Sequence, residues 1–259
     1  LGLDKNHRKL ANKVTQLVKH WDDVTDKNKQ GKAFGVQIKY DGVCAITIVK
    51  GDDVTIWSRT GKEFTNTGCM INSLLIADLR DGVYFGEMYV EKDIASLEEL
   101  SGVVNPNRTE PLTDKQTDIF HELKMAFFDL ISIESFIEGA SQTPFRVRHI
   151  HLEERIYPIQ NEFIKCVPYV VRQSLEHIEI TRDAMIAEGF EGIVIRDLGS
   201  DWIAGHKGYR AMKMVRGVDY DLRCIGYEEG TGKYEGKVAN LIFQWKNGET
   251  IKCMLGKGW

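Results

Sequence analysis

Gln37-Ile38-Lys39-Tyr40-Asp41-Gly42-Val43-Cys44 is the stretch that decides how this sequence folds. It ends one apolar strand and, after a turn that the glycine permits, begins another. A lysine is a nucleophile only when its amine is deprotonated, and burial or neighbouring positive charge favours that state. Lys39 meets the first condition. The string alone is weak evidence, because Lys-x-Asp-Gly occurs by chance in roughly one chain in twenty of this length and also suits an ordinary strand-end turn.

Further polar or aromatic residues stand at the edges of other apolar strands. They lie in Ser58-Arg59-Thr60-Gly61, Phe85-Gly86-Glu87-Met88, Phe127-Phe128-Asp129-Leu130, Glu191-Gly192-Ile193-Val194-Ile195-Arg196 and Ala211-Met212-Lys213-Met214. Two carboxylates, several cations and an aromatic ring could then converge on one pocket. That set suits a nucleoside triphosphate with Mg²⁺, because the metal prefers carboxylate and phosphate oxygens and cations offset charge on a transferring phosphoryl group.

The order and spacing of these motifs resemble the covalent nucleotidyltransferases, which comprise DNA ligases, RNA ligases and mRNA capping enzymes. Within that superfamily the sequence is most similar to ATP-dependent DNA ligases of phage type, from about Gln37 onward. The resemblance implies ATP and Mg²⁺ as cofactors, nicked duplex DNA as partner, and a role in DNA replication and repair. The enzyme would seal a 3′-hydroxyl to a 5′-phosphate.

The resemblance assigns the catalytic group to Lys39, Asp41 and Lys213. Lys39 would attack the α-phosphate of ATP, release pyrophosphate and form a lysyl-AMP phosphoramidate. Lys213 would contact the α-phosphate and stabilise the charge that develops there. AMP would then pass to the 5′-phosphate at a nick, and attack by the 3′-hydroxyl would seal the strand and expel AMP.

The same resemblance assigns nucleotide and metal contacts. Gln37 would read the adenine edge, and Phe128 would stack on the adenine ring. Arg59 would contact the nucleotide sugar or the nick phosphate. Glu87 would bind the ribose hydroxyl and assist the metal, while Glu191 would bind the catalytic metal.

Each assignment has a structural alternative. Arg59 could be a surface turn cation, Phe128 could belong to the core, and Gln37 favours neither reading. Glu87 and Glu191 flank very apolar strands, where an unpaired carboxylate is costly, and this favours the metal role. The histidines have no motif partners and are interpreted as structural or surface residues.

The sequence departs from the family pattern at three points. DNA ligases usually continue the first motif as Lys-x-Asp-Gly-x-Arg, and the last position here is Cys44, which cannot replace the paired donors of arginine. Either another cation compensates, or end-joining is weaker or differently targeted. A later motif usually reads Lys-x-Lys, and Val215 holds its second lysine position, where Arg216, Arg210 or Lys207 could substitute. The family's last motif is not found before Trp259, which predicts poor self-charging with ATP.

Hydrophobic periodicity predicts the elements around these motifs. Leu10, Val14, Leu17, Val18 and Trp21 recur at helical spacing and predict an opening amphipathic helix, and residues 22–33 form a loop. The remaining predictions are strands at residues 43–49, 54–57, 83–90, 125–131 and 193–195, and helices near residues 71–79, 145–156 and 174–188. A hairpin turn is expected at residues 50–53.

The predicted secondary structure changes near residues 216–219. Beyond them only strands are predicted, at residues 222–227, 238–245 and 250–255, fewer than the five that an oligonucleotide-binding (OB) barrel needs. We therefore expect an α+β adenylylation domain at residues 1–216, with two antiparallel-rich sheets and flanking helices. A partial OB-fold should follow at residues 217–259.

Composition limits the class of protein but does not identify a function. The chain has 259 residues, a net charge of −4 and 5 cysteines without metal-ligand or disulfide spacing. No apolar run is long enough to span a membrane. A cytoplasmic monomer, in a bacterium or a phage-infected host, is the expectation. Two rival functions stay open: an RNA ligase or capping-type enzyme, and a non-catalytic nick-binding module of the same fold, which the substitutions at Cys44 and Val215 motivate.

Overall fold

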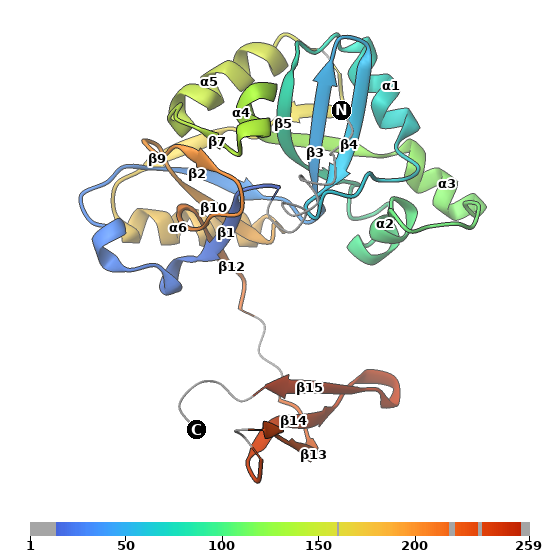
Figure 1. Cartoon of the computed structure of the whole chain (residues 1–259), viewed down its shortest axis with the longest axis vertical. Helices are drawn as coiled ribbons and strands as arrows, with labels where there is room; N and C mark the ends of the chain where they lie inside the picture. The colour runs from blue at the N-terminus through green and yellow to red at the C-terminus, as the bar shows by residue number, and fades with distance from the viewer. Residues whose placement is uncertain (1–13, 160, 218–220, 233–234, 255–259) are drawn as a thin grey trace. The chain divides into compact units, whose positions relative to one another are not determined.

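The computed structural model describes residues 14–159, 161–217, 221–232 and 235–254. The chain divides into two compact units, Leu1–Arg216 and Gly217–Trp259. Figure 1 draws both units, with the smaller one in orange and red. Each unit is described by itself.

The first sheet of the larger unit, sheet I, has the strand order β1-β12-β10-β2-β9. Its strands are β1 (Leu17–His20), β12 (Lys207–Val215), β10 (Gly192–Asp197), β2 (Phe34–Lys39) and β9 (Tyr169–Arg172). All neighbours pair antiparallel except β1 and β12, which are parallel. The register places Gln37 opposite Val194 and Val194 opposite Lys213, so these three residues form one row across the sheet.

The second sheet, sheet II, has the order β4-β3-β5-β6-β8. Its strands are β4 (Asp53–Ser58), β3 (Val43–Lys50), β5 (Gly82–Tyr89), β6 (Lys124–Ile131) and β8 (Ile164–Cys166). Only β6 and β8 pair parallel. The hairpin between β3 and β4 is confirmed, and Gly51 supplies its left-handed turn residue with φ of 57°. The row Cys44, Glu87, Ala126 and Lys165 runs across four of the strands.

The chain crosses between the two sheets by two short connections. Residues 40–42 join β2 of sheet I to β3 of sheet II. Val167 and Pro168 join β8 of sheet II back to β9 of sheet I. A buried cluster of Tyr89, Ala126 and Val167 lies at these connections. The two sheets are therefore tied together on both sides of one region.

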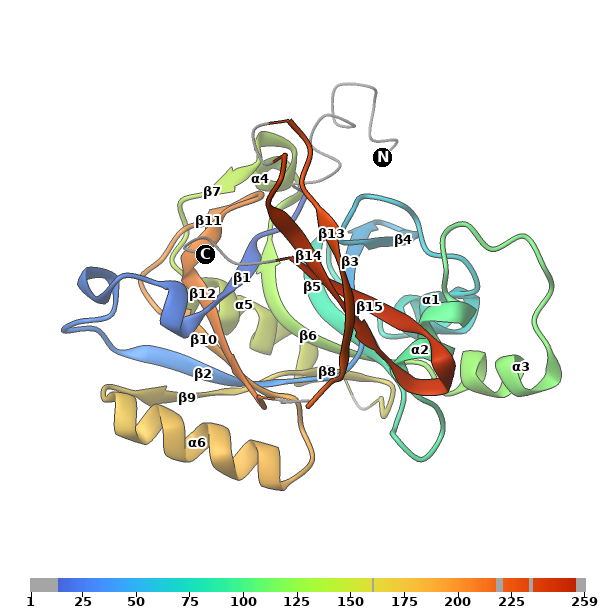
Figure 2. The ribbon, with the colours of Figure 1, turned by 90° about the horizontal axis from the view of Figure 1, so that it is seen from below.

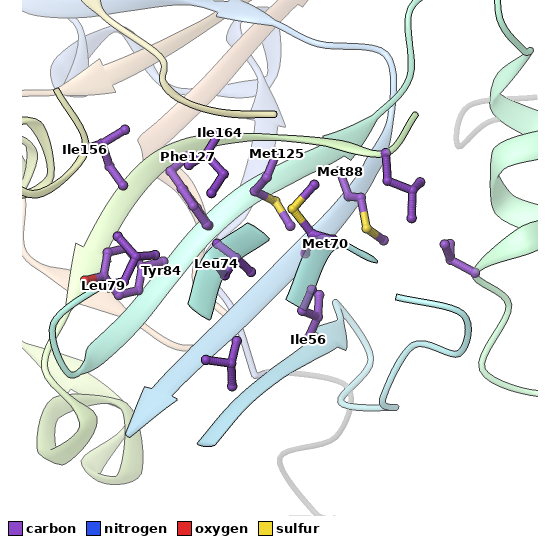
Figure 3. Close-up of a cluster of buried hydrophobic side chains, with 14 of the residues drawn as sticks. Ile56, Met70, Leu74, Leu79, Tyr84, Met88, Met125, Phe127, Ile156 and Ile164 are labelled. Carbon is purple, nitrogen blue, oxygen red and sulfur yellow. The ribbon is translucent and has the colours of Figure 1, made fainter. Parts of the chain in front are cut away.

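Helices flank both sheets. They are α1 (Gly68–Ile76), α2 (Leu97–Val103), α3 (Asp114–His121), α4 (Ile133–Glu138), α5 (Phe145–Ile156) and α6 (Leu175–Ala187). Helix α6 packs on β2, β9 and β10, as Figure 2 shows. The largest core cluster packs sheet II against its helices, with Met70, Leu74 and Phe127 at its centre (Figure 3). A two-stranded pair, β7 (Ala140–Ser141) with β11 (Trp202–Ile203), completes the unit.

The smaller unit is a three-stranded antiparallel sheet in the order β13-β14-β15. Its strands are β13 (Cys224–Glu229), β14 (Val238–Gln244) and β15 (Thr250–Met254). The three predicted strands are confirmed, although residue 255 lies outside the described residues. Within the described part of the chain these strands do not close into a barrel, so the mixed α+β class is confirmed but the OB-fold is not.

The opening helix is the main error of the sequence-based prediction. Within the described residues, the segment forms β1 followed by a 3-10 turn at Trp21–Asp23, and Leu10 lies outside them. Leu17 pairs with Lys207 and hydrogen bonds through its amide to the His206 carbonyl, so strand pairing overrides the helical spacing. None of the helices that the structure describes combines the length and apolar character needed to cross a bilayer.

Candidate active site

A pocket of about 150 Å³ lies between the two sheets of the larger unit, at the crossing connections. Five of the predicted site residues line it: Gln37, Lys39, Arg59, Glu87 and Phe128. Its remaining lining is Thr15, Gln16, Leu17, Val18, Ile38, Tyr40, Cys44, Val167, Val194 and Arg196. Residues that are distant in sequence therefore meet where the strand-edge motifs predict a pocket.

Lys39 stands at the end of β2, with its ammonium in contact with the Glu191 carboxylate. The side chain of Lys39 is 20% exposed, so its charge is partly removed from water. Gly192 lies opposite Lys39 in the register, and a Cβ there would come within 2.2 Å of the Met214 carbonyl oxygen. Only glycine permits this approach, which sets the Glu191 carboxylate beside the lysine.

Tyr40 holds the turn that follows Lys39. Its ring lies 4.9 Å from the ring of Tyr89 and 5.7 Å from the ring of Phe190. The Lys165 ammonium lies 4.7 Å from the centre of the Tyr40 ring. Gly42 completes the turn, because a Cβ at that position would approach the Met88 carbonyl oxygen to 2.5 Å. Aromatic packing and a glycine contact thus fix the backbone after the lysine.

Glu87 and Cys44 face each other across β3 and β5. Burial raises the pKa of the Glu87 carboxyl to about 7; Lys39 opposes this rise, and the Glu191 and Asp41 carboxylates add to it. Burial also raises the pKa of the Cys44 thiol to about 12, so the thiol is neutral at physiological pH. We call the region of Lys39, Glu87, Glu191, Asp41 and Arg59 the charged end of the pocket.

Phe128 enters the pocket because of a β-bulge. In the pairing of β5 with β6, Phe85 faces Asp129 and Gly86 faces Phe127, so Phe128 is left without a partner. An extra residue in one strand redirects its side chain out of the regular alternation. The bulge therefore turns the predicted stacking ring toward the pocket, whereas Phe127 is fully buried in the core.

Gln37 lies at the other end of the pocket and is 2% exposed. Its Nε2 donates a hydrogen bond to the Val167 carbonyl oxygen at 2.9 Å. Its Oε1 accepts one from Arg196 Nε at 3.1 Å. The Val167 carbonyl oxygen also lies 2.8 Å from His149 Nε2. We call Gln37, Arg196 and Val167 the amide end.

The other predicted residues lie at the margin of the pocket. Glu191 does not line it but contacts Lys39. Asp41 is exposed in the turn after β2, close enough to Glu87 to raise the pKa of that carboxyl. Lys213 is half-buried on β12 and paired in register with Val194, which does line the pocket. Arg59, which does line the pocket, reaches it from the exposed turn after β4.

Sequence reasoning missed Arg196, Val194, Val167 and the β1 segment as parts of the pocket wall. The motif that contains Arg196 was recognised, and an arginine that ends a run of apolar strand residues was a usable signal of a buried cation. Val167 contributes through its backbone, which no residue pattern reveals.

A family model described as "ATP dependent DNA ligase domain" matches residues 10–214, which span the pocket and both sheets. The chain belongs to this family.

Curated relatives carry the name DNA ligase. One from Saccharolobus islandicus (strain Y.N.15.51 / Yellowstone #2) is 27% identical over 237 residues, covering 86% of this chain and 38% of the relative. One from Saccharolobus solfataricus is 26% identical with the same coverage. The chain thus spans 38% of the length of these relatives.

Solved structures share the fold. The structure titled "Pmar-Lig_PreS3" aligns with a TM-score of 0.75 at 21% identity, covering 93% of this chain and 56% of that one. The ATP-dependent DNA ligase of bacteriophage T7 in complex with ATP aligns with a TM-score of 0.60 at 17% identity, covering 94% and 81%. At these identities the likeness establishes the architecture.

Proposed function

We propose that this chain is the catalytic part of an ATP-dependent DNA ligase that seals nicks through a covalent lysyl-AMP. The observation that carries the proposal is Lys39, held by Glu191 at the mouth of a pocket that also contains Gln37, Glu87 and Phe128. The bacteriophage T7 ligase in complex with ATP, whose fold this chain shares, supports it. Within it, residues 1–216 are the adenylylation domain and residues 217–259 belong to an OB-fold.

In the first step the Lys39 amine attacks the α-phosphate of ATP. A nitrogen–phosphorus bond forms, the bond to the bridging oxygen breaks, and pyrophosphate leaves. Glu191 holds the amine in line for attack and is the contacting group that can receive the proton it must lose. Lys213 and Arg59 offset negative charge on the phosphates, and Asp41 completes the catalytic group beside Lys39.

The base of the nucleotide occupies the amide end. Phe128 stacks on adenine, and Gln37 contacts its edge. The AMP then passes from Lys39 to the 5′-phosphate of nicked duplex DNA. Attack by the 3′-hydroxyl joins the strands and releases AMP. The chain acts in the cytoplasm as a monomer, in replication or repair.

Glu87 and Glu191 would hold Mg²⁺, which when bound would offset charge on the phosphates. The described residues contain no cluster of three or more metal-ligating side chains. Mg²⁺ needs none, since it is held by one or two carboxylates together with phosphate and water oxygens. The Glu87 pKa of about 7, raised mainly by burial and further by Glu191 and Asp41, fits this role, because a nearby cation would stabilise the charged carboxylate.

One observation favours a second candidate. Cys44, in the position of the family's usual arginine, removes a phosphate contact from the pocket wall. An enzyme that acts on RNA ends by the same lysine chemistry would need a different set of acceptor contacts. Comparing nicked DNA, nicked RNA and diphosphate-ended RNA as acceptors distinguishes the two.

The intact mass of the protein with ATP and Mg²⁺ tests the proposal. We expect a gain of one AMP, which Lys39→Ala lacks and which the exposed-lysine control Lys115→Ala retains. A second arm supplies pre-adenylylated nicked DNA and measures sealing. A protein that neither gains AMP nor seals this DNA would contradict the proposal and leave the non-catalytic nick-binding module as the better reading.

A further inference from the structure

Arg196 is an unusual residue for the wall of a pocket. It is 5% exposed, and among the described residues no carboxylate forms an ion pair with it. The nearby Asp129 is taken by Arg148, which holds both carboxylate oxygens at 2.8 and 2.9 Å. A buried cation without an ionic partner is costly to keep. The rings of Phe128 and Phe145, 4.8 and 5.4 Å from its guanidinium carbon, offset part of that cost.

The hydrogen bonds of Arg196 point to what it does. Arginine can only donate and a backbone carbonyl can only accept. Gln37 lies between such a pair, with Arg196 on one side and the Val167 carbonyl on the other. The amide oxygen of Gln37 must therefore face Arg196, and its nitrogen must face Val167. Rotating the amide by half a turn would set donor against donor and acceptor against acceptor.

This fixed amide leaves one donor and one acceptor for a ligand. The second hydrogen on Nε2 and the second lone pair on Oε1 stay available at the pocket. Adenine offers a complementary edge, because its amino group donates and the adjacent ring nitrogen accepts. Guanine carries an acceptor oxygen where adenine carries the amino donor. Glutamine could accommodate the Watson–Crick edge of guanine, an acceptor oxygen beside an N–H donor, only by turning its amide over, and in neither orientation could it pair both acceptors of the N7 edge.

We propose that Arg196 is a positioning residue that fixes the Gln37 amide and so makes the pocket select adenine over guanine nucleotides. The inference rests on the proposed function, in which the amide end receives the base. It separates two contributions: Gln37 contacts the base, and Arg196 decides which hydrogen-bonding pattern Gln37 presents. The chain would therefore discriminate against GTP by orientation of one side chain.

Arg196→Met tests the proposal, because methionine fills the space between the two rings but donates no hydrogen bond. We measure the second-order rate constant of covalent charging in single turnovers with α-labelled ATP and GTP, and the dissociation constants of both by calorimetry. The ATP:GTP ratio should fall by about ten-fold or more, the scale expected for one paired hydrogen-bond contact. Arg196→Lys, which can still donate to Gln37, should keep the ratio. So should Arg210→Met, which removes an arginine stacked on Tyr209 outside the pocket.

A second background separates positioning from packing. In Gln37→Leu the side chain has no hydrogen-bonding group to orient, so Arg196→Met should no longer change the ratio. The ratio is independent of the fraction of folded protein, so a purely structural role would lower both activities and leave it unchanged. An unchanged ATP:GTP ratio for Arg196→Met in the protein that retains Gln37 would overturn the inference. A wild-type protein that binds neither nucleotide would instead contradict the proposed function.

Discussion

The two ends of the pocket differ in how the protein compensates their buried polar and charged groups. At the amide end, Gln37 has a protein partner for both its oxygen and its nitrogen, and the Asp129–Arg148 pair behind it is doubly hydrogen bonded. At the charged end, burial raises the pKa of the Glu87 carboxyl to about 7, and the Glu191 and Asp41 carboxylates add to that rise. The protein itself fixes the polar groups of the amide end, whereas the carboxylates of the charged end would be offset by a cation that accompanies the nucleotide. This difference indicates a base site that is rigid and a phosphate site that would be stabilised by the bound cation.

The largest expected effect comes from breaking the ion pair behind the amide end. Arg148→Met leaves the Asp129 carboxylate buried without its partner and should lower the free energy of unfolding by about 3–5 kcal/mol. Denaturant unfolding monitored by circular dichroism measures it. Lys115→Ala removes the exposed pair with Glu99 and serves as the control, with no resolvable change expected. Equal losses in both variants would contradict the expectation that the buried Asp129–Arg148 pair contributes more than an exposed pair.

At the charged end, Glu191→Gln should act on chemistry. The amide keeps the shape of the side chain but not the charge that holds the Lys39 ammonium. The rate of lysyl-AMP formation should fall by about 10²–10³-fold, the loss typical for one preorganised electrostatic group. Single-turnover charging at saturating ATP provides the rate. An unchanged rate would show that the Lys39–Glu191 contact has no part in the step.

The smallest expected effect is a gain in the free energy of unfolding, whereas Arg148→Met lowers it. Glu87 has a raised pKa in the folded protein, so the folded state binds its proton more tightly than the unfolded state. Its contribution to stability is therefore present below pH 4.5 and is lost as pH rises toward about 7. Glu87→Gln removes this loss and should be more stable than the wild type at pH 8, by on the order of 2 kcal/mol.

Unfolding free energies of the two proteins at pH 5 and pH 8 test this prediction. The difference should be larger at pH 8 and shrink at pH 5, where the wild-type carboxyl is protonated. If the stability difference between the wild type and Glu87→Gln is the same at both pH values, the pKa of the Glu87 carboxyl is not raised in the folded state.

The sequence predicted the strands of the pocket better than the helices around it. Apolar β-branched runs located β3, β4, β5, β6 and β10, because the mostly buried or half-buried side chains of these strands leave a recognisable apolar signal. Helices α2 and α3 went unpredicted although Ser96 with Glu99 and Thr113 with Gln116 form capping boxes that were readable in the sequence. Strand β1 was misassigned because its pairing partner is almost two hundred residues away.

The site followed the same pattern. Side chains at strand edges could be placed together from motif order, and five of them line one pocket. The bulge that aims Phe128 and the carbonyl of Val167 could not be predicted, since both depend on backbone register between distant strands. Their functional roles stay predictions.

The two crossing connections limit how this pocket can move. One joins the sheets beside Lys39 and the other beside Gln37, with three and two residues respectively. Links this short cannot lengthen enough to let the two sheets separate. The pocket therefore keeps its width when ligands bind and leave. In hydrogen-exchange terms, the Val167 amide, bonded to the Phe127 carbonyl at 2.7 Å, should open only with the whole unit, whereas the exposed turn at Arg59 should exchange early.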